Sequence, residues 1–308
     1  MPDDLDLIGA LEKNVARCIV GKPEVVRLAV IGLLARGHLL IEDVPGVGKT
    51  TLAAALARSI SGRFARIQFT ADMLPSDVIG VSVWDAARGE FSFKQGPLFA
   101  NIVLADEINR TAPKTQSSLL EAMNEAQVSL DHTTHALPAP FMVLATQNPR
   151  EYEGTYPLPE SQLDRFLLRV RIGYPDAEDE KAILRGAAAS PDTLAPALGL
   201  EDVRRLQTLA DTVRVADLVL DYVMMLVSAT RDSQSLALGV SPRGARALVA
   251  AARAAALTDG RDYVLPDDVK RLAVPALAHR VIPRASEGGA LDAGSVVHAI
   301  VQDTPVPR

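Results

Sequence analysis

The stretch 38–51 constrains the fold of this chain more than any other part of it. It begins with a short apolar run, Leu39-Leu40-Ile41, passes through a loop with two glycines, and ends in Gly48-Lys49-Thr50. The alanine-rich segment that follows, 52–57, favours helix, because Ala and Leu lose little freedom in that conformation. A strand, a glycine-containing loop and a helix, in that order, form the local structure in which phosphate-binding loops occur.

The residue types in this loop suit a bound polyphosphate. Gly46 and Gly48 allow backbone N–H groups to turn toward phosphates, where a Cβ would clash. The helix start adds free N–H groups and the positive end of its dipole. Lys49 is predicted to reach the β- and γ-phosphates, and the Thr50 hydroxyl to ligate Mg²⁺. Asp43 is a departure, because the usual motif opens with glycine there, although Asp tolerates a turn. The predicted phosphate cradle is Pro45, Gly46, Val47, Gly48, Lys49, Thr50 and Thr51.

Composition narrows the class of protein. The 308 residues are 48% hydrophobic and 23% charged, which is ordinary for a globular protein. The net charge of −6 offers no global basic field to nucleic acid or anionic lipid, although a local basic patch is compatible with it. The single cysteine, Cys18, rules out an internal disulfide. The acidic N-terminus lacks a signal-peptide profile, and Arg36 and His38 interrupt the most apolar region. We therefore expect a cytoplasmic protein without a membrane span.

Apolar runs separated by helical segments predict a parallel α/β sheet. Besides 39–41, the strand candidates are 66–69, 101–105, 141–145 and 166–170. The carboxyl ends of parallel strands meet at one edge of the sheet, where ligands bind. Lys49, Asp106, Glu107 and Asn148 all follow strand candidates, so we expect them to cluster at that edge.

The remaining sequence predicts hairpins and a helical C-terminal part. Alternating residues in 81–93 and 127–137 indicate two β-hairpins. Trp84, the only tryptophan, lies near the tip of the first, where it either packs the hairpin down or contacts a partner. Residues after Tyr174-Pro175 show helical patterns, with a loop expected over 284–295. The predicted domains are an α/β nucleotide-binding domain, 1–174, and a helical lid domain, 175–308.

Asp106 and Glu107 are the acids that a phosphate-binding loop requires as partners. One carboxylate is predicted to hold Mg²⁺, and the next to orient and deprotonate the attacking water. Asn148 is placed to position the same water. Taken alone, the acid pair would be interpreted as solvated acids at a strand end, and Asn148 could be a turn residue.

At the level of whole motifs, the chain resembles the MoxR family of AAA+ ATPases. The motifs that carry the resemblance occur in family order over about residues 15–285. They are Glu42–Thr50, Arg66–Thr70, Leu74–Asp77, Gln95–Asn101, Leu104–Arg110, Pro113–Gln116, Ala145–Pro149 and Leu158–Phe166. The departures, such as Asp131-His132 in a hairpin turn where the family often has Asp-Gly, do not touch the proposed chemistry.

The resemblance implies roles for particular residues. Lys49 and Thr50 match Walker A, Asp106 and Glu107 match Walker B, and Asn148 matches sensor 1. Two arginines have implied roles as well. Arg165 matches the arginine finger that reaches a neighbour's site, with Arg169 as the competing candidate, and Arg243 matches sensor 2, which contacts the phosphates. Val20 and Gly21 lie where such proteins usually hold adenine through backbone contacts.

The resemblance also implies a fold and an activity. It predicts a five-stranded parallel sheet between helices, with hairpin inserts and an all-α lid, assembled into a ring that is usually hexameric. The implied activity is Mg²⁺-dependent ATP hydrolysis that drives chaperone-like maturation of, or metal insertion into, a protein client. The partner often carries a von Willebrand factor A domain. Two alternatives stay open, a nucleic-acid motor and a nucleotide switch that does not hydrolyse ATP.

Overall fold

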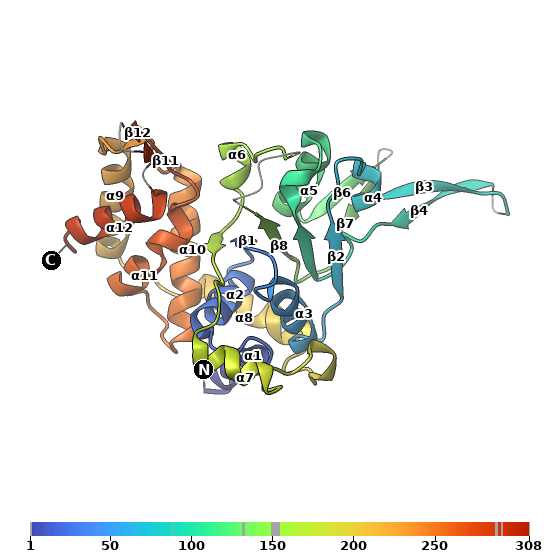
Figure 1. Ribbon diagram of the computed structural model, residues 1–308, viewed down its shortest axis with the longest axis horizontal. Coiled ribbons are helices and arrows are strands. Elements are labelled where there is room, and N and C mark those ends of the chain that lie inside the picture. Colours follow the sequence, from blue (N-terminus) through green and yellow to red (C-terminus); the bar gives the residue numbers. More distant parts are fainter. Residues whose placement is uncertain are drawn as a thin grey trace.

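In the computed structural model of this chain, a five-stranded sheet lies between two layers of helices (Figure 1). The structure describes residues 2–87, 89–130, 133–148, 155–286, 289–290 and 292–307. The strands of this sheet are β1 (Leu39–Glu42), β2 (Phe64–Gln68), β5 (Ile102–Asp106), β8 (Met142–Gln147) and β9 (Leu168–Val170). They are ordered β2-β5-β8-β1-β9, and every pair is parallel. The predicted fold class, an AAA+-type α/β core with a helical lid, is confirmed.

The sheet is buried on both faces, which explains why its strands read as continuous apolar runs. Leu39 and Ile41 of β1 point into one core, whereas Leu40 between them points into the other. In β5, Leu104 and Val103 divide between the two cores in the same way. All of these side chains are fully buried. This alternation follows from the period of two in a strand.

Different helices cover the two faces of the sheet. The helices on one side are α1 (Pro2–Ala16), α2 (Pro23–Leu34) and α3 (Lys49–Ser59). On the other side lie α4 (Pro75–Ile79), the 3₁₀ turn η1 (Ile108–Arg110), α5 (Pro113–Glu125) and α6 (Glu160–Leu163). Pro23, Pro75 and Pro113 each occupy the first position of their helix, where a missing N–H costs nothing.

Both predicted hairpins are present. The first pairs β3 (Gly80–Asp85) with β4 (Glu90–Gln95) and projects away from the sheet as an arm (Figure 1). The second pairs β6 (Gln127–Leu130) with β7 (Thr133–Ala136). The turn residues Asp131 and His132 lie outside the described residues.

The part of the chain after residue 174 is mainly helical. Its helices are α7 (Ala177–Leu184), η2 (Pro191–Thr193), α8 (Leu200–Thr212), α9 (Asp217–Asp232), α10 (Pro242–Thr258), α11 (Pro266–Leu277) and α12 (Ala293–Asp303). Short two-stranded ladders accompany them, β10 (Leu236–Leu238) with β11 (Ile282–Pro283) and β12 (Ala285–Ser286) with β13 (Gly289–Ala290). The loop expected over 284–295 was therefore wrong in part. Asp292 caps α12 by accepting a hydrogen bond from the Ser295 N–H at 2.8 Å, so the helix starts inside that range.

The helices after residue 174 do not all pack together. Helix α8 packs against α2, and η2 packs against α3, so both belong spatially with the sheet-covering layer. Helices α9, α10, α11 and α12 form a bundle beyond β9, at the left of Figure 1, and α10 also packs against α2 and α8. The division into domains 1–174 and 175–308 stays a prediction. Among the described residues, no helix combines the length and apolar character needed to cross a bilayer.

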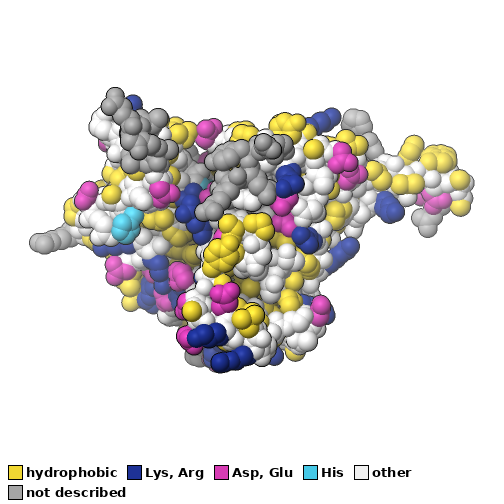
Figure 2. Space-filling view, in the orientation of Figure 1, with side chains coloured by type: hydrophobic (Ala, Val, Ile, Leu, Met, Phe, Trp, Pro, Cys, Tyr) yellow, Lys and Arg dark blue, Asp and Glu magenta, His cyan; other side chains and the backbone are white. Residues whose placement is uncertain are grey.

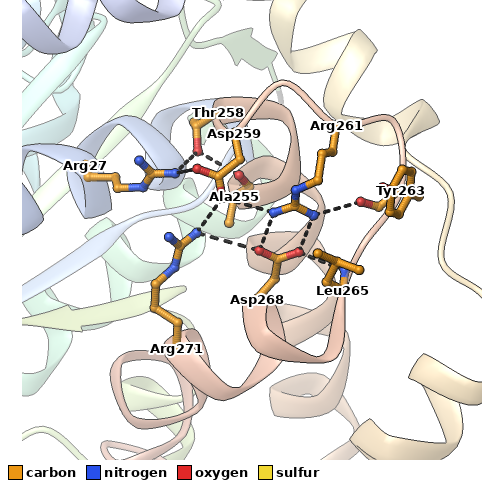
Figure 3. Close-up of polar contacts among 9 residues, drawn as sticks. All are labelled: Arg27, Ala255, Thr258, Asp259, Arg261, Tyr263, Leu265, Asp268 and Arg271. Atoms are coloured by element: carbon orange, nitrogen blue, oxygen red, sulfur yellow. Dashed lines mark hydrogen bonds and ion pairs between the residues drawn. The ribbon is translucent and has the colours of Figure 1, made fainter.

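An ion-pair network fastens the helical bundle to the sheet-covering layer (Figure 3). Arg27 of α2 pairs with Asp259, which follows α10. Arg261 and Arg271 also reach Asp259, at 3.0 and 3.2 Å, and Arg261 forms a bidentate pair with Asp268 at 2.7 Å. Burial alone would raise the pKa of the Asp259 carboxyl. Hydrogen bonds and charges from the arginines outweigh burial and hold that pKa below its ordinary value of 3.8.

This network predicts a pH-dependent contribution to stability. Because folding lowers the pKa of Asp259, its contribution is complete above the unfolded-state pKa, near 4, and is lost as the pH falls through the folded-state pKa. Asp259→Asn should lower the free energy of unfolding by about 1.5–3 kcal/mol at pH 7, the range for hydrogen bonds to charged groups. Urea unfolding of both proteins between pH 7 and pH 2.5 measures the difference, which should decrease progressively as the pH falls below about 4.

Asp262→Asn is the matched control, because Asp262 pairs with Arg214 in the same region but is 55% exposed. Its effect should stay within about 1 kcal/mol. A difference between wild type and Asp259→Asn that stayed constant down to pH 3 would contradict the assignment.

Candidate functional site

The loop between β1 and α3 has the conformation that the sequence predicted. Gly46 and Gly48 have φ values of 86° and 98°, in the region where side chains are strained. Nothing lies within 4 Å of a Cβ built on Gly46, so backbone conformation rather than crowding requires glycine there. Helix α3 begins at Lys49, and the Lys49 Nζ donates to the Asp43 carbonyl oxygen at 2.9 Å. The loop thus surrounds a space at the N-terminus of a helix.

A hydrogen-bonded relay joins the acid pair to the neighbouring strand. The Thr146 hydroxyl on β8 donates to Asp106 Oδ1 at 2.7 Å and accepts the Glu107 N–H at 2.9 Å. Arg66 of β2 donates to the other oxygen of Asp106 at 2.7 and 3.2 Å. Glu107 has a φ of 57° and pairs with Arg110 at 2.7 Å. A non-glycine residue in this left-handed conformation is uncommon, and such backbone strain is often found at functional sites.

With the exception of Val47, the predicted phosphate and acid residues line one cavity of about 360 Å³ at the carboxyl edge of the sheet. It is lined by Pro45, Gly46, Gly48, Lys49, Thr50, Thr51, Arg66, Gln68, Asp106, Glu107 and Asn148. The hydroxyl of Thr50 and the carboxylate of Asp106 are hard oxygen donors of the kind that Mg²⁺ accepts together with phosphate oxygens. Within the described residues, no group of three acidic, histidine or cysteine side chains is placed to hold a metal alone. The donor set therefore fits a Mg²⁺ that arrives with a polyphosphate.

A second cavity, of about 590 Å³, adjoins the same loop. Gly46, Gly48 and Thr51 line both cavities, and Val47 lines the second. Its other walls come from Val20, from the segment after β9 and from α7, including Ile183 and Leu184. This wall is more apolar than that of the first cavity, as a nucleobase requires. Gly21 is not among the lining residues, but its φ of 74° and its contact with Asp179 leave no room for a side chain.

The predicted arginines lie away from both cavities. Arg165 is half-buried and donates to the Leu120 carbonyl at 2.7 Å, and its Nε finds no hydrogen-bond partner among the described residues. Arg243 is exposed and bonds to the Asn124 side chain. Burial and the nearby charge of Arg243 lower the pKa of Arg165. Arg169, the competing finger candidate, lies on β9 and pairs with Glu42 at 3.2 Å.

Comparison with known proteins agrees with this geometry. Residues 38–168 match the family described as "ATPase family associated with various cellular activities (AAA)", and residues 228–300 match the AAA lid domain. The chain is 50% identical to YeaC of Bacillus subtilis, over 98% of this chain and 95% of that protein. It is 45% identical to Chaperone MoxR1 of Mycobacterium tuberculosis, over 87% of this chain and 74% of that one. The chain belongs to the MoxR family of AAA+ ATPases.

A solved structure shows that this likeness extends over the whole fold. The crystal structure of a protein described as an ATPase, from Cytophaga hutchinsonii, superposes with a TM-score of 0.91 at 36% identity. The match covers 100% of this chain and 97% of that one. Family membership and this likeness support nucleotide binding by this MoxR protein.

The segment that carries Arg165 is held by a residue that sequence reasoning missed. Arg280, after α11, has a side chain only 2% exposed and donates to Asp164 Oδ1 at 2.8 Å. It also donates to the carbonyl oxygens of Asp164, Phe166 and Leu167 at 3.2, 2.5 and 3.2 Å. The other carboxylate oxygen of Asp164 accepts from the Ser241 hydroxyl at 3.0 Å. Arg280 and Ser241 therefore bind the chain on both sides of Arg165. No local sequence pattern indicates this role of Arg280.

The buried histidines of this MoxR protein are structural. His38 Nδ1 accepts the Val143 N–H at 3.0 Å, so Nε2 carries the proton and donates to the Met123 carbonyl at 2.9 Å. Burial lowers the pKa of His38 to about 4, which keeps the ring neutral at physiological pH. His279 lies against the Phe166 carbonyl at 3.0 Å, and burial also lowers its pKa.

Pro149, the last residue of the predicted sensor 1 motif, lies outside the described residues.

Proposed function

We propose that this MoxR protein hydrolyses ATP with Mg²⁺ and uses the energy to remodel protein clients. The observation that carries the proposal is the 360 Å³ cavity, which is lined by Lys49, Thr50, Asp106, Glu107 and Asn148 together. These residues come from three different strand ends, so a phosphate-binding loop with no catalytic purpose would have no reason to gather them. The adjoining cavity provides room for the base and ribose.

Each residue has a task in the proposed reaction. Lys49 exchanges the Asp43 carbonyl for phosphate oxygens, since a carbonyl is the weaker partner for an ammonium group. Glu107 accepts a proton from the attacking water, and Asn148 orients that water. Thr50 and Asp106 would hold Mg²⁺, which supplies charge neutralisation at the phosphates. Asp106 keeps its orientation through Thr146, which also fixes the backbone of Glu107.

We infer that Arg165 and Arg243 complete the site of a neighbouring subunit in a ring. Neither residue lines the phosphate cavity of its own chain. Burial and the nearby charge of Arg243 lower the pKa of Arg165, and Glu121 only partly offsets this. Two adjacent cations on one surface are suited to an anionic group supplied by another molecule. A triphosphate bound to the adjacent protomer has that chemistry, and a hexameric ring would supply one at every interface.

The exposed side chains of the β3–β4 arm support the proposal that the client is a protein. Figure 2 shows hydrophobic side chains along the projecting arm. Trp84 and Phe91 are 54% and 70% exposed and meet edge to face, with ring centroids 5.2 Å apart. Val81 and Val83 are exposed on the opposite face of the same hairpin. A patch of this kind matches apolar segments of a partner protein, whereas a phosphate backbone would call for Lys and Arg.

The nucleic-acid motor is the weaker alternative, because the net charge is −6 and the arm exposes four large hydrophobic side chains, Val81, Val83, Trp84 and Phe91. Salt-dependent DNA binding with DNA-stimulated hydrolysis would favour it. A partner with a von Willebrand factor A domain, and metal insertion as the outcome for the client, stay predictions from the family.

Glu107→Gln should separate nucleotide binding from hydrolysis. Loss of a general base costs about 10²–10⁴-fold in rate, while the amide keeps the shape and the cavity. We expect ATP affinity within a few-fold of wild type and turnover reduced at least 100-fold, measured by fluorescent-nucleotide titration and phosphate release. Glu125→Gln, an exposed acid on α5, is the control and should retain activity. Equal turnover in wild type and Glu107→Gln would instead support the non-hydrolysing switch.

A mixing experiment tests whether Arg165 acts on a neighbour. Arg165→Ala and Lys49→Ala should each lose activity, the former by about 10³–10⁵-fold. In a mixed ring, a subunit with intact Lys49 meets an intact Arg165 at about a quarter of the interfaces, by random pairing in a closed ring. Phosphate release should therefore reappear on mixing. Activity that stays absent, although both variants assemble, would place Arg165 outside the neighbour's reaction.

The client proposal predicts a selective defect in the arm. Trp84→Ala combined with Phe91→Ala should abolish the stimulation of ATP hydrolysis by an unfolded probe protein such as β-casein, and leave basal hydrolysis within twofold. Leu218→Ala on α9 is the matched control, because Leu218 is 53% exposed and α9 lies at the opposite end of the molecule from the arm (Figure 1). Equal stimulation of the double variant and wild type would remove the arm from client binding.

A further inference from the structure

Asp43 occupies the position where a phosphate-binding loop usually has glycine, and its carboxylate is fully engaged. Asp43 Oδ1 accepts the N–H of Val44 at 2.9 Å. Its Oδ2 accepts the N–H groups of Ile172 and Gly173, both at 2.7 Å. These distances are those of strong, charge-assisted hydrogen bonds. The side chain that replaces glycine therefore ties the loop to the chain leaving β9.

The parallel sheet explains why these groups meet. Leu39 of β1 lies opposite Leu168 of β9, and Ile41 lies opposite Val170. Continuing this register by two residues places Asp43 opposite Ile172. Gly173 has a φ of 65°, so the chain turns there and presents two successive N–H groups to one carboxylate oxygen. A glycine at position 43 would leave both of these partly buried donors without this partner.

The two ends of this tie belong to different halves of the nucleotide site. On the loop side, the Asp43 carbonyl holds Lys49, and the loop lines the phosphate cavity. On the other side, Ile172 and Gly173 line the second cavity, next to Tyr174 and Pro175. Lys22 adds a further anchor to this wall by donating to the Tyr174 carbonyl at 2.6 Å.

We propose that Asp43 is a positioning residue that fixes the wall of the base cavity relative to the phosphate cradle. It touches neither phosphate nor base itself. With Asp43 in place, the second cavity, which would hold the base, is already at the correct distance from the phosphate cradle. A nucleotide can therefore obtain binding free energy from both cavities without a cost for ordering the wall. The inference rests on the proposed nucleotide site, and it assigns a purpose to the residue by which this loop departs from the usual motif.

The proposal predicts that Asp43 variants bind two ligands differently. ATP uses both cavities, whereas inorganic tripolyphosphate uses only the phosphate cradle. Asp43→Gly, which restores the usual motif, should weaken ATP binding at least tenfold and tripolyphosphate binding less than threefold. Asp43→Asn keeps the shape and one acceptor oxygen but turns an NH₂ group toward a donor, so its loss of ATP affinity should be intermediate.

Isothermal titration of each ligand into the full-length protein provides the measurement, with circular dichroism to confirm folding. Asp202→Asn is the matched control, because Asp202 also accepts a backbone N–H, that of Gly199 at 3.0 Å, but lines neither cavity. Its ratio of ATP to tripolyphosphate affinity should equal that of wild type. If Asp43→Gly does not fold, the same ratio in Asp43→Asn decides the question.

The outcomes separate this inference from the proposed function. A wild-type protein that binds neither ligand overturns the nucleotide site and the inference with it. A wild-type protein that binds ATP, together with variants that lose affinity for both ligands by the same factor, overturns the positioning role and makes Asp43 a residue of the cradle alone. Unchanged affinities in both variants overturn the inference as well.

Discussion

The parallel pairing of β1 with β8 and β9 is the constraint on which the site depends. Because parallel strands end at one edge, the residues that follow them become neighbours irrespective of their distance in sequence. Glu42 is opposite Gln147, and their side chains bond at 2.6 Å. The same register brings Asp43 to Ile172, and the pairing of β8 with β5 brings Thr146 to Asp106. A slip of one residue in any of these strands would reverse every side chain and dismantle the cavity.

The charged side chains of the site all have partners within the protein. Asp106 is paired with Arg66, Glu107 with Arg110, and Lys49 with a carbonyl oxygen. These ion pairs are partly exposed, since the arginines are 49% and 44% accessible, so each contributes little to stability. Replacing such an exposed ion pair by another partner costs little free energy. A magnesium–triphosphate complex offers stronger partners to the same acids and the same lysine, which makes rearrangement on binding energetically reasonable.

Sequence reasoning found those parts of the site that local patterns encode. The loop around Gly46 and Gly48 is predictable because left-handed backbone requires glycine, and the acids of β5 are predictable because a buried strand must end before charges can reach solvent. Asp43 looked like a harmless departure, because its partners lie about 130 residues away in the chain. Arg280 carried no signal at all, since one arginine after a helix reads as a surface residue until the structure buries it. Long-range hydrogen bonds of this kind depend on tertiary packing, which periodicity and spacing do not report.

The two anchors of the helical bundle suggest how it would be coupled to hydrolysis. One anchor, Arg27 with Asp259, joins α2 to the end of α10. The other, Arg280 with Asp164, joins the end of α11 to the backbone beside Arg165, and Ser241 adds the start of α10 to the same carboxylate. Removing either partner of the buried Arg280 pair would leave a charge uncompensated, so the bundle cannot leave this segment without a large cost. A displacement of the bundle that keeps the Arg280–Asp164 pair would carry Asp164 and Arg165 with it. If Arg165 completes a neighbour's site, the position of the bundle would control ATP hydrolysis in the neighbouring subunit. Arg280 would transmit this effect, because it connects the bundle to the backbone beside Arg165.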